Sequence, residues 1–161
     1  MHEIEARQIT ETVARLFREA NVSLPDDVLA ALKSARATEV SPAARDALDR
    51  ILENATIAGA EGTPLCQDTG TSVVFLELGQ EVHVTGGDLY SAINEGVRQG
   101  YKEGYLRKSM AARPFTARTN TMDNTPAVIY TDVVPGDKLR IIALPKGGGA
   151  ENMSALKMLS P

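Results

Sequence analysis

Apolar residues recur with a helical period over the first sixty positions. A first helix is predicted over about residues 2–20, because its apolar positions fall on one side. Those positions are Ile4, Ile9, Val13, Leu16, Phe17 and Ala20. Pro25 followed by two acidic residues predicts a second, short helix, and Ser41-Pro42 predicts a third that ends near Gly59 and Gly62. The first sixty residues are therefore expected to form a helical layer.

The pattern changes after residue 70. Residues 72–78 are nearly all apolar, which predicts a strand buried on both faces, and residues 81–84 alternate as a short strand does. A helix is predicted to start after Asp88. Gly96 and Gly100 lie four apart on its inner face. Each glycine costs about 1 kcal/mol of helix propensity relative to alanine, so we expect another backbone to approach closely there.

Two more apolar runs, residues 127–134 and 139–144, are predicted strands. Pro135-Gly136-Asp137 between them has the composition of a turn, which favours an antiparallel hairpin. Helices followed by mixed strands and helices indicate an α+β fold. We expect a single domain over residues 1–161, with a helical layer at 1–60 and a mixed part at 61–161.

Composition narrows the function classes. Hydrophobic residues make up 43% and aromatic residues 4%, with no tryptophan, so the core must be aliphatic. A net charge of −4 with interleaved signs argues against nucleic acid as a partner. No apolar run approaches the roughly 20 residues of a membrane helix, so no membrane association is expected. One cysteine cannot form an internal disulfide, which suits a reducing cytoplasm.

That cysteine lies in a polar loop, residues 62–71, that leads into the first long strand. Cys66, Gln67 and Asp68 are consecutive and are bracketed by glycines. Loops of this kind often place functional groups on a rigid scaffold. The alternative is a small buried thiol with a packing role, which is the commoner fate of a lone cysteine.

A second glycine-rich stretch follows the last predicted strand. Gly147, Gly148 and Gly149 come after Lys146 and before a helical pattern. Backbone N–H groups at such a turn form a cradle for an anion, and the lysine adds positive charge. The spacing is not that of a Walker phosphate loop. The alternative is a flexible exit from the strand.

A third candidate is Arg107, within a basic segment after the long helix. A guanidinium can hold a carboxylate with two parallel hydrogen bonds. The alternative is a solvated basic face. Combined with the glycine cradle and the Cys66 loop, Arg107 indicates a small polycarboxylate ligand. His2 and His83 have no metal-ligand spacing with Cys66.

Three motifs in this order resemble the α region of class I fumarases and tartrate dehydratases, the iron–sulfur hydro-lyases. The resemblance covers essentially the whole chain. The motifs are Pro64-Leu65-Cys66-Gln67-Asp68-Thr69-Gly70, Asp123-Asn124-Thr125-Pro126-Ala127 and Pro145-Lys146-Gly147-Gly148-Gly149-Ala150-Glu151-Asn152. Members of that family carry three cysteines, so the resemblance implies the N-terminal part of an α subunit, either truncated or split.

The resemblance also implies roles for individual residues. Cys66 would be the one ligand present, of three, to a 4Fe–4S cluster whose open iron acts as a Lewis acid. Gln67 and Asp68 would contact the substrate, with Asp68 as the catalytic residue, and Arg107 would pair with a substrate carboxylate. The backbone of Gly147, Gly148 and Gly149 would meet its other end. The residue that takes the proton from carbon would lie in a β region that is absent here.

The expected function is therefore part of a hydro-lyase that interconverts fumarate and malate. Expected partners are this small dicarboxylate, the rest of the α subunit and a β subunit, in a homo- or hetero-oligomer. The isolated chain should be inactive. A tartrate dehydratase α subunit and a non-catalytic subunit-interaction domain are the alternatives.

Overall fold

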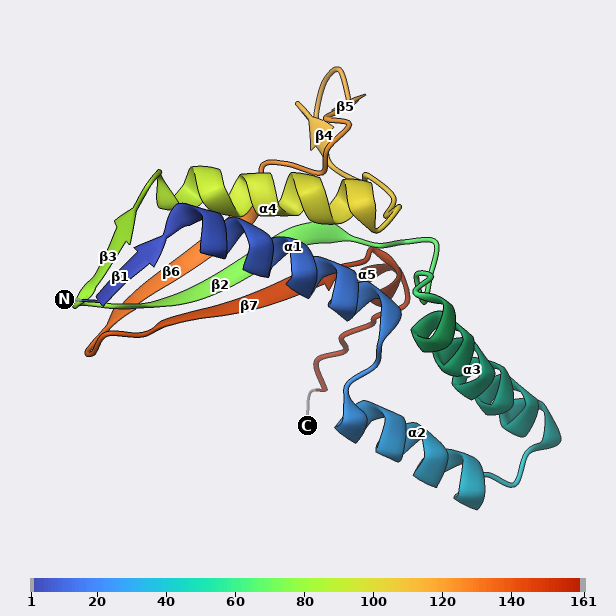
Figure 1. Ribbon diagram of the computed structural model, residues 1–161. Coiled ribbons are helices and arrows are strands. Elements are labelled where there is room, and N and C mark those ends of the chain that lie inside the picture. Colours follow the sequence, from blue (N-terminus) through green and yellow to red (C-terminus); the bar gives the residue numbers. More distant parts are fainter. Residues whose placement is uncertain (1, 160–161) are drawn as a thin grey trace.

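The computed structural model describes residues 2–159, and within them helices and strands are mixed as the α+β class requires (Figure 1). The fold class is confirmed. The elements are, in chain order, β1 (His2–Glu5), α1 (Ala6–Val22), α2 (Asp26–Thr38), α3 (Pro42–Glu61), β2 (Thr71–Gly79), β3 (Val82–Thr85), α4 (Leu89–Glu103), β4 (Ala111–Ala112), β5 (Thr119–Asn120), β6 (Val128–Val134), β7 (Leu139–Lys146) and α5 (Gly149–Asn152). No helix between residues 2 and 159 combines the length and apolar character that crossing a bilayer needs.

The N-terminus differs from the expectation of a helix starting at residue 2. Residues 2–5 form β1, which pairs in parallel with β3. Helix α1 then begins at Ala6, where Glu5 and Gln8 form a reciprocal capping box. Pairing with β3 satisfies the backbone hydrogen-bonding groups of residues 2–5. A long-range contact therefore overrides the local helical pattern.

Helices α2 and α3 pack against each other and extend away from the body of the molecule (Figure 1). The Ser41 side chain accepts a hydrogen bond from the Ala44 N–H at the start of α3, and Gly62, with φ +66°, ends that helix. These boundaries are where the cap and glycine signals predicted them. Helix α2 is longer than the short helix that was expected, at 13 residues.

The central sheet corrects the predicted hairpin. Its strand order is β6-β2-β7, with β2 parallel to β6 and antiparallel to β7. Strands β6 and β7 run in opposite directions, as predicted, but β2 lies between them. The connecting turn wraps around the end of β2, where Gly79, Gln80 and Glu81 donate hydrogen bonds to Lys138, Val134 and Gly136. A turn signal marks a reversal of the chain and does not say which strand fills the space.

Strand β2 is buried on one face only. Val74 and Leu76 are 0% and 1% exposed beneath the helices, whereas Phe75 between them is 41% exposed. The expectation of burial on both faces is therefore wrong for this chain. The outer face is an apolar patch, which we call the open sheet face. It comprises Val73, Phe75, Val128, Tyr130, Ile142 and Leu144.

The core is formed by α1 and α4 lying across the inner face of the sheet. A Cβ placed on Gly96 would lie 2.6 Å from the Thr10 carbonyl oxygen and 2.7 Å from the Val13 Cβ, and one on Gly100 would lie 2.9 Å from the Ala14 carbonyl oxygen. The two glycines thus let α4 approach the backbone of α1. The predicted close approach is confirmed.

Substitution of Gly96 by alanine should test this packing. Overpacking against a backbone oxygen costs about 1–3 kcal/mol, which outweighs the gain of about 1 kcal/mol in helix propensity. Urea denaturation of Gly96→Ala should therefore show a lower free energy of unfolding. The matched control is Gly59→Ala in α3, where the nearest atom to a new Cβ is 4.0 Å away; it should leave stability unchanged or raise it. Equal effects at the two positions would contradict the packing argument.

Candidate functional site

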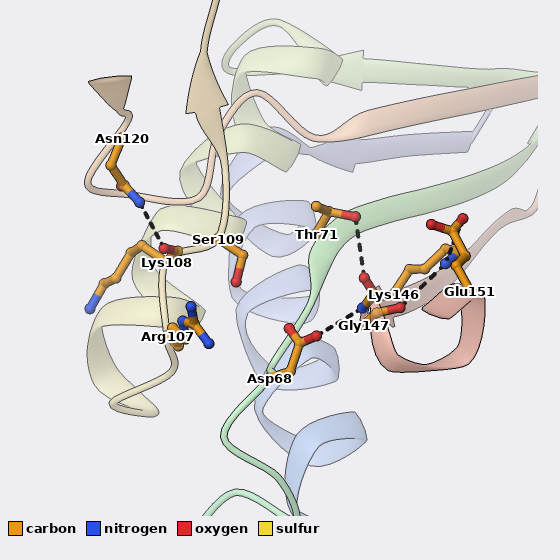
Figure 2. Close-up of a pocket in the computed structure, with 10 residues that line it drawn as sticks. Asp68, Thr71, Arg107, Lys108, Ser109, Asn120, Lys146, Gly147 and Glu151 are labelled. Carbon is orange, nitrogen blue, oxygen red and sulfur yellow. Dashed lines mark hydrogen bonds and ion pairs between the residues drawn. The ribbon is translucent and has the colours of Figure 1, made fainter. Parts of the chain in front are cut away.

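A cavity of about 450 Å³ lies where the loop before β2, the segment after α4 and the end of β7 meet (Figure 2). Three parts of the sequence that are far apart thus contribute to one site. Its lining residues are Asp68, Thr71, Arg107, Lys108, Ser109, Asn120, Lys146, Gly147, Gly148 and Glu151. Each of the three sequence regions singled out for chemistry supplies part of this lining.

The Asp68 carboxylate is held by two backbone N–H groups. Gly148 donates to one oxygen at 2.8 Å and Gly70 to the other at 3.1 Å. These bonds, Gly148's above all, lower the pKa of Asp68, and the charges of Arg107 and Lys146 add to the effect. Asp68 is therefore a carboxylate at neutral pH. The glycine cradle expected for an external anion already binds this internal one through Gly148.

The backbone at Gly70 brings these two segments together. Its φ is +76°, and a Cβ there would lie 2.6 Å from the backbone N and C of Lys146. No side chain fits, because the end of β7 passes directly across. Thr71 adds a hydrogen bond of 3.4 Å from its hydroxyl to the Lys146 carbonyl. The Cys66 loop and the glycine-rich stretch are thereby fixed to each other.

The wall of the cavity that faces Asp68 is cationic. Arg107, Lys108 and Ser109 follow the buried Leu106, and the Arg107 carbonyl accepts a hydrogen bond of 2.9 Å from the Thr69 hydroxyl. Among residues 2–159, neither Arg107 nor Lys108 forms an ion pair, whereas Lys146 pairs with Glu151 at 3.0 Å. Figure 2 shows the Arg107 side chain and the Asp68 carboxylate on opposite sides of the cavity. Two cations without a carboxylate partner leave the cavity suited to an anion.

Cys66 and Gln67 lie at the surface, in the loop just before Asp68, and neither lines the cavity. The alternative of a buried structural thiol is wrong, because Cys66 is free and exposed. The loop is held at the neighbouring Leu65, whose N–H donates to Asn21 and whose carbonyl accepts from Asn54, both at 2.8 Å. Cys66 is thus presented on an anchored loop.

The described residues include no group of three or more His, Cys, Asp or Glu side chains that could hold a metal ion. One exposed cysteine in the loop that leads to a cationic cavity nevertheless suits a single ligand to an iron–sulfur cluster, since such clusters are held by cysteine thiolates. The sequence has one cysteine, so further ligands would have to come from elsewhere. Cys66 fits the group as one of several ligands.

Gly149 lies apart from the other two glycines. It begins α5, does not line the cavity, and has no atom within 4 Å of where a Cβ would be. A Cβ on Gly147 would instead lie 3.2 Å from an Asp68 carboxylate oxygen. The structure thus brings Asp68, Arg107, Gly147 and Gly148 together and leaves Gly149 outside. Their contact with a substrate stays a prediction.

Sequence reasoning missed several lining residues and one buried polar residue. Ser109 and Asn120 line the cavity, and nothing in their sequence context singles them out. Asn124, which is 0% exposed, links the two walls through four side-chain hydrogen bonds. The sequence placed Asn124 in one of the three family motifs but gave it no role.

The contrast between Gly147 and Gly149 gives a testable prediction. Gly147→Ala should lower the free energy of unfolding by roughly 1 kcal/mol, because the new methyl group presses on the Asp68 carboxylate. Gly149→Ala meets no atom and should be neutral. Urea denaturation of both variants is the measurement. A larger loss in Gly149→Ala than in Gly147→Ala would contradict the described geometry.

The sequence of the chain is similar to those of known proteins. The sequence model of a family described as fumarate hydratase (Fumerase) matches residues 10–161. The chain is 41% identical over 159 residues to a protein of Methanocaldococcus jannaschii named putative L(+)-tartrate dehydratase subunit alpha, covering 96% of this chain and 55% of that one. It is 34% identical over 152 residues to the aerobic class I fumarate hydratase of Escherichia coli K12, covering 94% of this chain and 26% of that protein.

A third relative is fumarate hydratase 2 of Leishmania major, 37% identical over 107 residues, which are 66% of this chain and 19% of that protein. The chain therefore spans about half the length of the M. jannaschii relative and about a quarter of the E. coli one.

Proposed function

This chain belongs to the fumarate hydratase family, and from that membership we propose that it forms the N-terminal part of the α region of an iron–sulfur hydro-lyase. The reaction is the reversible addition of water to fumarate to give malate. The observation that carries the proposal is the cavity in which an ionised Asp68 faces the unpaired cations Arg107 and Lys108, beside the exposed Cys66.

The charges of the cavity support a dicarboxylate as ligand. Arg107 can take one carboxylate with two hydrogen bonds, and Lys108 adds positive charge on the same wall. Gly147 and Gly148 lie at the other end of the cavity, where Glu151 partly neutralises the charge of Lys146. The lining carries three cations, Arg107, Lys108 and Lys146, and two carboxylates, Asp68 and Glu151, so its net charge of +1 favours an anion.

Asp68 has the properties of a group that acts near the reacting atoms. It is ionised and fixed by two backbone donors, so it can accept a hydrogen bond from a hydroxyl or a water at a defined position. A preorganised acceptor of this kind does not have to reorient during the reaction. We assign Asp68 the catalytic role in this chain. Gln67 does not line the cavity, and its contact with the substrate is proposed from the resemblance to the family alone.

Cys66 is the residue of this chain that would hold a 4Fe–4S cluster, as one of three thiolate ligands. When bound, such a cluster supplies an open iron that acts as a Lewis acid on a substrate hydroxyl and carboxylate. The anchored loop places the Cys66 thiol two residues from Asp68. The proposed cluster ligand and the proposed catalytic carboxylate therefore belong to the same loop.

A tartrate dehydratase is the second candidate, since the M. jannaschii relative at 41% identity carries that name. Tartrate has one more hydroxyl than malate. The Ser109 side chain points toward the cavity (Figure 2), and its hydroxyl can pair with that group. A non-catalytic interaction domain is disfavoured, because it has no use for a fixed carboxylate opposite unpaired cations.

The proposed partners are the remainder of an α region and a β subunit, within a homo- or hetero-oligomer in the cytoplasm. The open sheet face supports the first of these. Phe75 and Tyr130 stack there with ring centroids 5.1 Å apart, and a row of charged residues, Asp132, Glu77 and Arg140, borders the apolar patch. An apolar centre with a polar rim is the usual anatomy of an interface. The remainder of the α region is the occupant we assign to it.

The test is an anaerobic reconstitution with iron and sulfide. The 161-residue chain alone should not turn over fumarate or L-tartrate, whereas the chain co-expressed with the missing α region and a β subunit of the family should. Cys66→Ser in that assembly should lose cluster absorbance and activity together, because serine lacks the soft ligand. Turnover by the chain alone, or full iron content in Cys66→Ser, would overturn the proposal. The preferred substrate separates the two candidate reactions.

Arg107→Lys tests the carboxylate contact in the same assembly. Lysine keeps the charge but not the two-pronged geometry, so KM should rise roughly ten- to a hundredfold. Arg113→Lys is the matched control, since Arg113 lies on an exposed turn outside the cavity. A KM for Arg107→Lys equal to that of the control would place Arg107 on a solvated face.

A further inference from the structure

The cationic wall is an irregular segment, residues 107–110, and it is held at every residue. The Arg107 carbonyl accepts from Thr69, and the Lys108 carbonyl accepts a bond of 2.9 Å from the Asn120 side chain. The N–H groups of Ser109 and Met110 both donate to Asn124 Oδ1, at 2.6 and 3.1 Å. A segment outside helix and sheet owes its shape to such side-chain contacts.

Asn124 forms the link that reaches the other wall. Its Nδ2 donates to Ser72 Oγ at 2.8 Å and to the Gly70 carbonyl at 3.3 Å. Its amide therefore uses two donors and accepts two bonds while being 0% exposed. Gly70 in turn donates its N–H to Asp68. The side chain of Asn124 thus connects the Ser109 backbone to Asp68 through a single intervening residue.

The backbone around Asn124 is itself held in place. Its φ of +63° is one that asparagine tolerates better than most residues. Asp123 before it pairs with Arg98 on α4 at 3.1 Å, and the Ala127 N–H after it donates to Asn94 Oδ1 at 2.8 Å. The loop 123–127 is therefore anchored to α4 on both sides of Asn124.

We propose that Asn124 is a positioning residue, which sets the separation between the wall of Arg107, Lys108 and Ser109 and the wall of Asp68. It does not line the cavity, so it acts through the backbone of residues 109–110. The inference rests on the proposed function for its catalytic consequence, since a ligand held between two walls is sensitive to their spacing. A misplacement of about 1 Å can cost on the order of a hundredfold in rate.

Two substitutions separate positioning from general stability. Asn124→Gly removes every side-chain bond while keeping the left-handed backbone available. Asn124→Asp keeps an oxygen that accepts hydrogen bonds from Ser109 and Met110 but loses both donated bonds. This variant replaces Asn124→Gly in the test if the glycine variant does not fold. The matched control is Asn94→Ala, which releases the other end of the same loop and touches neither wall.

Amide hydrogen exchange of the full chain is the first measurement. Asn124→Gly should speed exchange of residues 109–110 by tenfold or more, Asn124→Asp should restore most of their protection, and Asn94→Ala should affect residue 127 instead. Unchanged exchange at 109–110 in Asn124→Gly would overturn the proposal, as would an equal change in Asn94→Ala.

Kinetics of the assembled enzyme are the second measurement. Asn124→Gly should raise KM and lower kcat, each by roughly tenfold or more, with cluster absorbance intact, whereas Asn94→Ala should resemble the parent. Identical kinetics for the two variants would overturn the positioning role. An assembled parent without any hydratase activity would instead count against the proposed function, and the exchange measurement then decides the role of Asn124 by itself.

Discussion

The hydrogen bond from the Gly148 N–H to Asp68 joins two segments 80 residues apart, and the rest of the site depends on it. It closes the loop before β2 onto the end of β7, next to Gly70, where the two backbones leave no space for a side chain. The same bond lowers the pKa of Asp68 below its ordinary value, because it stabilises the charged form directly. One contact therefore shapes the cavity and stabilises the charge of its Asp68 carboxylate.

The core beneath this contact supplies its rigidity. Tyr101 on α4 is fully buried, and its hydroxyl donates to the carbonyls of Thr69 and Gly70 at 2.7 and 3.2 Å. Burial raises the pKa of Tyr101 to about 12, so the phenol remains a donor throughout the physiological range. Helix α4 reaches that depth because Gly96 and Gly100 allow it to lie against α1. The packing of two helices thus fixes the loop that carries Cys66 and Asp68.

The cavity is polar, whereas the uncovered face of the central sheet is apolar. The cavity is lined by charged groups and backbone amides, whereas the open sheet face exposes Phe75, Tyr130 and their neighbours. The first feature suits a small anion, and the second suits a protein surface. Family membership and the partial coverage of the relatives agree with this division, since a chain of this length supplies part of a larger hydro-lyase in our proposal.

The sequence by itself determined the elements whose signals are local. Ser41-Pro42 and Gly62 bounded α3, the glycine pair on α4 predicted close packing, and the three motifs indicated the family before any contact was known. Tertiary structure decided the rest. It placed β2 between β6 and β7, drew residues 2–5 into a strand, put Asp68 in the glycine cradle and made Asn124 a link between two walls. Each of these depends on hydrogen bonds between distant segments, whose partners no local pattern of residues specifies.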